Sequence, residues 1–110
     1  MPLQKDISCL LRDQSDAIVA GVYASVWGNV CNIKGLWVHE AHRRKGLGKQ
    51  LLELVEQEAL AYGCTLLTIF PYSFQEPKFY QLQGFEFAGV IEDSPFPHKL
   101  YFLQKNLASQ

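Results

Sequence analysis

The segment HEAHRRKGLG (residues 39–48) decides the fold, because the hydrophobic pattern of the chain changes on its two sides. The apolar run before it, residues 36–38, is typical of a buried strand, and residues 49–56 after it have the periodicity of a helix. Three consecutive cations, at positions 43–45, therefore lie where the helix begins. A helix N-terminus has unpaired N–H groups and a partial positive charge, so cations there are unfavourable unless an anion binds. Two glycines at positions 46 and 48 would let an anion approach the backbone, and we therefore predict a phosphate-binding turn.

The composition indicates one globular domain over residues 1–110 with a local anion site. The chain has 110 residues, is 48% hydrophobic and carries a formal net charge of -1. These values support a real core and exclude a broad basic surface for nucleic acid. The cations are concentrated instead, since the ten lysine and arginine residues include Arg43, Arg44, Lys45 and Lys49.

Neither a membrane span nor a secretory signal is indicated. The sequence has no apolar run near the ~20 residues that a span needs, and its first residues lack the apolar core of a signal peptide. The cysteines Cys9, Cys31 and Cys64 are odd in number, lie in apolar stretches and form no CxxC pair. We therefore expect reduced core thiols, no metal site and a cytoplasmic location.

The first part of the chain predicts an antiparallel meander. Residues 7–11 are a short strand candidate, and residues 17–27 are rich in β-branched and aromatic side chains. Residues 30–38 are expected to return as a third strand. The dipeptide Gly28-Asn29 between the last two is a hairpin signal, and Gly21 is expected to be a bend or bulge.

The second part predicts helices alternating with strands. A helix over residues 46–62 leads to an apolar strand over 65–70, expected to be buried on both faces and parallel to the strand at 30–38. Ser73 and Glu76 have capping-box spacing, which predicts a short helix over 74–82. Strands over 85–90 and 99–103 follow, separated by a proline-containing loop. The predicted fold class is α/β, with a mixed, mostly antiparallel sheet and helices packed on it.

Two motifs on these elements resemble the GNAT superfamily of N-acetyltransferases. The family motif Arg/Gln-x-x-Gly-x-Gly/Ala, after a strand ending in Val, appears as residues 43–48 after Val38. The family segment Phe-Tyr-x-x-x-Gly-Phe appears as residues 79–85. Ser73-Phe74-Gln75 and the ending at 101–105 are similar to one group of bacterial members. The resemblance covers about residues 7–105 and implies a GNAT acyl-CoA N-acyltransferase-like fold.

The resemblance implies acetyl-CoA as co-substrate. In the family the turn binds the pyrophosphate through backbone N–H groups, and the strand before it flanks the pantetheine arm. The cofactor-binding residues implied by position are Leu36, Trp37, Val38, Arg43, Arg44, Lys45, Gly46, Leu47 and Gly48, with Ser73 near the cofactor or capping its helix.

The resemblance also implies Tyr80 as the acid that protonates the departing CoA thiolate. Core packing beside Phe79 and Phe85 is the alternative reading of this side chain. A backbone N–H near Trp37 or Val38 would stabilise the oxyanion. The strand over 30–38 carries no carboxylate, so a water-mediated proton route, or an amine that arrives neutral, is expected in place of a general base.

One departure from the family pattern affects the acceptor site. Family members typically have a strand and two helices before the meander, and this chain is N-terminally shortened. We expect exposed apolar surface, an open sheet edge and a homodimer in which the partner supplies cover.

Three functions stay open on this basis. The first is an N-acetyltransferase acting on a small-molecule or protein amine. The second is a catalytically weak or inactive module that binds acyl-CoA or CoA as a dimeric sensor or interaction protein. The third is a structural subunit that binds no CoA.

Overall fold

The computed structural model describes residues 4–107, which form one sheet and two α-helices. The strand order in the sheet is β1-β2-β3-β4-β6-β5. In chain order the elements are β1 (Gln4–Arg12), β2 (Ile18–Trp27), β3 (Val30–Val38), the 3-10 turn η1 (Glu40–His42), α1 (Leu47–Ala61), β4 (Leu66–Ile69), the 3-10 turn η2 (Ser73–Gln75), α2 (Pro77–Leu82), β5 (Glu86–Ile91) and β6 (Leu100–Asn106).

The strand directions match the fold class predicted from the sequence. The pairs β1–β2, β2–β3, β4–β6 and β5–β6 are antiparallel. Only β3 and β4 are parallel among the strands of residues 4–107, because α1 connects them as a crossover. The sheet is therefore mixed and mostly antiparallel, as predicted.

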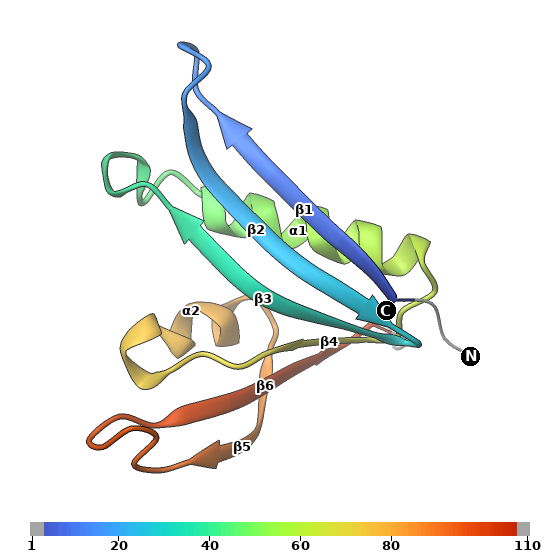
Figure 1. Cartoon of the computed structure of the whole chain (residues 1–110), viewed down its shortest axis with the longest axis vertical. Helices are drawn as coiled ribbons and strands as arrows, with labels where there is room; N and C mark the ends of the chain where they lie inside the picture. Colours follow the sequence, from blue (N-terminus) through green and yellow to red (C-terminus); the bar gives the residue numbers. More distant parts are fainter. Residues whose placement is uncertain (1–3, 108–110) are drawn as a thin grey trace.

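The sheet opens between its two parallel strands. Residues 30–33 of β3 pair with residues 66–69 of β4, and the pairing ends there. Figure 1 shows the two strands diverging beyond this point, with β1–β3 and α1 on one arm and β4, β6 and β5 on the other. A β-bulge lies at the same place, since Tyr23 and Ala24 of β2 pair with Gly35 and Ile33 and leave Lys34 unmatched. A bulge bends its strand, so it supports the divergence of β3 from β4.

Both helices cover one face of the sheet. The apolar stripe of α1 packs with β2 side chains and with Tyr80 of α2 in one core, whose fully buried members include Leu51, Val55 and Leu67. The opposite face of β1–β3 leaves Trp27 and Trp37 65% and 47% exposed. The expected apolar surface is therefore present. The prediction that β4 is buried on both faces was wrong, because its residues alternate between half-buried and buried.

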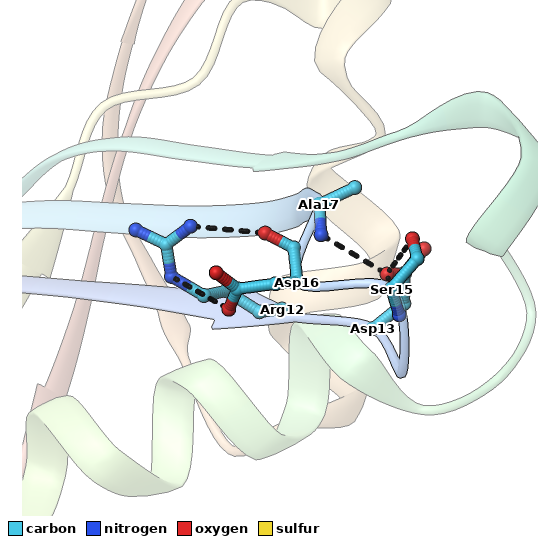
Figure 2. A network of polar contacts seen from close by, with 5 residues as sticks. All are labelled: Arg12, Asp13, Ser15, Asp16 and Ala17. Carbon is cyan, nitrogen blue, oxygen red and sulfur yellow. Dashed lines mark hydrogen bonds and ion pairs between the residues drawn. The ribbon is translucent and has the colours of Figure 1, made fainter.

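The β1–β2 hairpin tip is held by its own polar side chains (Figure 2). Asp13 Oδ1 accepts hydrogen bonds from the N–H groups of Ser15 and Ala17 and from the Ser15 hydroxyl. These bonds, the Ser15 hydroxyl first, lower the pKa of Asp13. Arg12 Nη1 donates to the Asp16 carbonyl at 3.1 Å. The tip lies beside η1, with Asp13 Oδ2 4.0 Å from His42 Nε2.

Three local predictions are corrected by the structure. Gly21 lies in regular β2 and not at a bulge; its lack of a side chain makes room for the Trp37 indole, since a Cβ there would lie 2.7 Å from Nε1. The helix expected over 74–82 is divided into η2 and α2, because Glu76 adopts a left-handed conformation with φ 54°. Strand β6 extends to Asn106, beyond the predicted end, because its residues 103–106 pair with β4.

Candidate active site

A cleft of about 920 Å³ fills the space where β3 and β4 diverge. Its walls come from β3 beyond the bulge, the turn before α1, the end of β4, η2 and α2. Segments that are distant in the sequence therefore meet here because the sheet opens. The predicted residues that line the cleft are Leu36, Trp37, Val38, Arg43, Arg44, Gly46, Leu47, Gly48 and Tyr80, while Lys45 and Ser73 are not among the lining residues.

The turn before α1 has the geometry of an anion site. Arg44 and Gly46 have positive φ angles, 65° and 78°, and left-handed residues of this kind occur in the backbone N–H nests that bind anions. The N-terminus of α1 has no side-chain cap and no acidic residue in its first turn. Arg43 Nε donates to the Val38 carbonyl at 3.3 Å, which ties the turn to the end of β3. An anion would satisfy the uncapped N–H groups, so the donor set fits a phosphate group.

The part of β3 that leaves β4 offers free backbone groups to the cleft. Pairing on the β4 side ends at Ile33, and Leu36, Trp37 and Val38 follow along the wall. A Cβ at Gly35 would meet no atom within 4 Å, so this stretch of wall is open. An extended ligand with amide groups can therefore pair with β3 as an added strand would.

Tyr80 projects from α2 into the cleft. Its side chain is only 7% exposed, and its ring packs edge-on against Phe79 and Phe85 at centroid distances of 5.1 and 6.0 Å. The Tyr80 hydroxyl makes no hydrogen bond within the described residues. Every fully buried polar side-chain atom of residues 4–107 has a hydrogen-bond partner, so the hydroxyl oxygen is not fully buried. The hydroxyl oxygen must therefore be open to the cleft. Burial, and then the nearby Glu76 carboxylate, raise the pKa of Tyr80 to about 12, which keeps this oxygen protonated.

Ser73 takes a different place from the one expected. Its hydroxyl accepts a hydrogen bond from Lys99 N at 3.1 Å, and its own N–H donates to the Lys99 carbonyl at 2.8 Å. Gln75 closes the turn instead, because its Oε1 accepts from Tyr72 N at 2.9 Å. The capping role predicted for Ser73 was therefore wrong. Ser73 fixes the β5–β6 loop beside η2.

Glu76 lines the cleft, although the sequence pattern marks it only as part of a capping box. Glu76 is the only carboxylate among the described cleft-lining residues, which include the cations Lys34, Arg43, Arg44 and Lys49. It is the N-cap residue of α2, four residues before Tyr80, and its carboxylate lies near enough to contribute to the raised pKa of Tyr80. This spacing is visible in the sequence. The left-handed backbone of Glu76 cannot be seen in the sequence, and it separates Glu76 from the regular helix α2.

The described residues offer neither a metal site nor a membrane-spanning helix. No group of three or more potential metal-ligating side chains occurs within residues 4–107. No helix in this range is long and apolar enough to cross a membrane. The three cysteines are free: Cys31 and Cys64 are buried in the core and Cys9 is half-buried.

A family model and a protein of known activity match the sequence. The model for the "Acetyltransferase (GNAT) family" matches residues 3–85. The blasticidin-S acetyltransferase of Streptomyces morookaense is 31% identical over 91 residues, which are 82% of this chain and 67% of that protein.

Solved acetyltransferase structures superpose on the chain. An acetyltransferase from Bacillus cereus ATCC 14579 does so with a TM-score of 0.91 and 35% identity, over 94% of this chain and 74% of that one. An aminoglycoside 6'-N-acetyltransferase complexed with coenzyme A does so with a TM-score of 0.84 and 17% identity, over 93% and 73%. The second likeness is one of fold alone. Together these structures confirm the fold class.

Proposed function

The chain belongs to the GNAT family of acetyltransferases, and from this premise we propose that it transfers the acetyl group of acetyl-CoA to a primary amine by direct attack. The observation that carries the proposal is the unpaired Tyr80 hydroxyl, which opens into the same cleft as the uncapped turn at residues 43–48. Acetyl-CoA supplies an activated thioester, whose carbonyl carbon forms the new C–N bond while its C–S bond breaks.

The turn and β3 would hold the co-substrate. The backbone N–H groups at the start of α1, with the Arg43 and Arg44 side chains, suit a pyrophosphate, since both the helix dipole and the cations favour negative charge. The free backbone of β3 at Leu36–Val38 suits the amide groups of a pantetheine arm. An N–H near Trp37 or Val38 would stabilise the oxyanion in the transition state.

Tyr80 would act as the general acid. Its Oη holds a proton at neutral pH because the pKa is raised to about 12. That proton would pass to the sulfur when the C–S bond breaks, and the thiol would leave neutral. Solvent in the open cleft would reprotonate the oxygen for the next turnover.

Glu76 would receive the proton that the attacking amine loses. It is the one acidic side chain among the described residues of the cleft wall, and a carboxylate also attracts a protonated amine before attack. This assignment replaces the water-mediated route expected from the carboxylate-free β3. It requires no metal ion.

The acceptor is a small or peptide-borne amine with an apolar part. Phe74 is 62% exposed at the cleft wall and stacks on Tyr72 with a centroid distance of 5.5 Å. An exposed aromatic face favours an apolar or cationic group. Blasticidin S, which names the relative from Streptomyces, is the first amine to test. The free thiols support a reducing compartment such as the cytoplasm.

A CoA-binding module without turnover is the second candidate. The observation that favours it is the uncovered sheet face, on which Trp27 and Trp37 are exposed. If this face is part of an incomplete acceptor site, CoA binding would stay intact and acetyl transfer would be lost. The two candidates differ in thiol release from acetyl-CoA with an amine panel. Thiol release together with thermal stabilisation by CoA supports the enzyme, and stabilisation alone supports the module. If no CoA species raises the melting temperature, both are contradicted.

A further inference from the structure

The strand β1 is a long sheet edge with an open side. It runs from Gln4 to Arg12 and pairs with β2 on one side only among the described strands. An edge of this length presents a row of unpaired backbone groups, which is a template for another strand. Leu10 is 49% exposed on it and Cys9 is half-buried. The edge therefore has both the hydrogen-bonding groups and the apolar surface that a second strand would cover.

The charges on β1 are self-complementary in one register. If β1 pairs antiparallel with β1 of a second copy about an axis at Cys9, Asp6 of each copy lies opposite Arg12 of the other. If the axis lies between Ser8 and Cys9, Lys5 faces Arg12 of the second copy. If it lies between Cys9 and Leu10, Asp6 faces Asp13. Those two registers oppose like charges, which is unfavourable across strands. The register about Cys9 places only opposite charges across the axis: Asp6 faces Arg12 and Lys5 faces Asp13, each twice by symmetry.

The Asp6 carboxylate is free for this pairing, and the Arg12 guanidinium would be shared with Asp16 of its own hairpin. The Asp6 carboxylate is exposed and has no ion pair or hydrogen bond within the described residues. The Arg12 guanidinium is held at the end of β1 by the Asp16 carbonyl, with Nε 3.8 Å from the Asp16 carboxylate (Figure 2), while its side chain stays 48% exposed. The Asp6 carboxylate therefore has no partner within the described residues, and the Arg12 guanidinium is fixed in position by Asp16.

The same register extends the core. It places Ile7 opposite Leu11 and Cys9 opposite Cys9 of the second copy. These odd-numbered side chains lie on the face that α1 covers, since Ile7 is buried and Cys9 and Leu11 pack against the core. Apolar groups of the two copies would therefore meet on the same face.

The opposite edge of the sheet does not suit a second copy. Strand β5 is irregular between Phe87 and Gly89. Antiparallel pairing about Gly89 would bring Glu86 opposite Glu92. A bulge and like charges both protect an edge from pairing. Strand β1 has a register shift of its own, but it lies at the strand end, between Leu11 and Arg12, whereas the β5 bulge lies within the strand. The charges and the longer regular stretch therefore favour β1.

We propose that the chain forms a homodimer in which β1 pairs antiparallel with β1 of a second copy about a twofold axis at Cys9, joining the two sheets into one. The proposal concerns an interface away from the cleft and is independent of the proposed activity. Its occupant is a second copy because the charge pattern matches itself.

Charge reversal tests the register. Sedimentation equilibrium at low to tens of micromolar protein should show a dimer for the wild type. Asp6→Arg and Arg12→Asp should each raise the dissociation constant by about 10-fold or more, because each places two like-charge pairs across the axis. The double variant should return to within about threefold of the wild type, since the opposite charges are exchanged. Glu86→Arg on β5 is the matched control and should have no effect.

Cross-linking tests the axis. A short bismaleimide, which adds one thiol across each of its two C=C bonds, should link two wild-type chains and should not link the Cys9→Ser variant. Cys31 and Cys64 are buried and should not react. A wild type that sediments as a monomer at tens of micromolar overturns the proposal. A dimer that keeps its dissociation constant in both single variants, or that gives no Cys9-dependent link, overturns it as well.

Discussion

Gly48 lies against the ring of Phe79 so closely that a Cβ atom at position 48 would be 3.1 Å from Cζ. The first turn of α1, which ends the proposed phosphate site, is thus in direct contact with α2. Phe79 precedes Tyr80, and their rings pack edge-on at 5.1 Å. The proposed anion site and the proposed acid are therefore packed together through Phe79. A substitution at the anion site should also displace the Tyr80 side chain.

The variant Gly48→Ala tests this coupling. A methyl group there would force the Phe79 ring to move, so the Kd of CoA should rise and kcat should fall, each by about 10-fold. The melting temperature should change little, because alanine is favoured over glycine in a helix by about 1 kcal/mol and offsets the contact. Calorimetric titration with CoA and steady-state kinetics measure the two effects. The double variant Gly48→Ala/Phe79→Leu should recover CoA binding, and unchanged binding in the single variant would contradict the coupling.

The glycine before α1 should matter for CoA binding beyond its effect on stability. Gly46 and Gly63 stand at the two ends of α1, both with positive φ (78° and 83°), and a Cβ atom at either position would meet no atom within 4 Å. Alanine at either position should destabilise the fold by about 1 kcal/mol, because a left-handed backbone disfavours a side chain. Chemical denaturation should give similar losses for both variants. Only Gly46→Ala should also raise the Kd of CoA, and equal affinities in the two variants would refute the role of the turn.

The cations of the turn should contribute unequally. Arg44 lines the cleft and Lys45 does not. Arg44→Gln should raise the Kd of CoA by about 10-fold, since a charge-assisted hydrogen bond is worth about 1.5–3 kcal/mol. Lys45→Gln, which removes the same charge, should change it by about twofold or less. Titrations at two salt concentrations measure both, and equal losses would indicate a diffuse field in place of specific contacts.

Glu76→Gln should lower kcat with little change in the KM for acetyl-CoA. We expect a loss of about 10-fold to 100-fold near neutral pH, because the amine then has no acceptor for its proton. The loss should shrink as the pH rises toward the pKa of the amine, where the substrate is already neutral. Glu53→Gln on the exposed side of α1 is the control. A variant that changes only the KM for acetyl-CoA would place Glu76 beside the co-substrate instead.

The pH dependence of kcat tests the state of Tyr80. Its pKa is raised to about 12, so the protonated form, which is the acid, is present below that value and is lost only as the pH rises toward it. The rate should therefore show no alkaline decrease due to Tyr80 up to about pH 10, the unperturbed value for tyrosine. An alkaline limb centred near pH 8–9 that disappears in Tyr80→Phe would contradict this state.

Much of the fold follows from local patterns in the sequence. The apolar stripe predicts α1 to within a residue at each end, and a single helix between two apolar strands predicts the parallel pair β3–β4. Charge alone predicts the turn, because cations at an uncapped helix start are unfavourable unless an anion neutralises them. The identity of its ligand comes from the family resemblance and not from the charges.

The features that could not be predicted depend on partners distant in the chain. The bulge at Lys34 arises from the register between β2 and β3, which no pattern within β3 records. Ser73 bonds to Lys99, 26 residues away, so its local capping spacing was misleading. Glu76 became a candidate only when the structure placed it in the cleft with Tyr80. Local periodicity therefore predicted the elements, and only their packing in the structure showed which residues line the candidate site.

The most direct test of the proposed function is transfer of radiolabelled acetyl from acetyl-CoA to a panel of primary amines that begins with blasticidin S, by the wild type and by Tyr80→Phe. Both proteins should bind CoA equally and melt at similar temperatures, because the hydroxyl makes no hydrogen bond within the described residues. The wild type should acetylate at least one amine about 100-fold faster than the variant, as expected for loss of a general acid. Absence of labelled amine with the wild type, or equal rates for the two proteins, would contradict the proposed function.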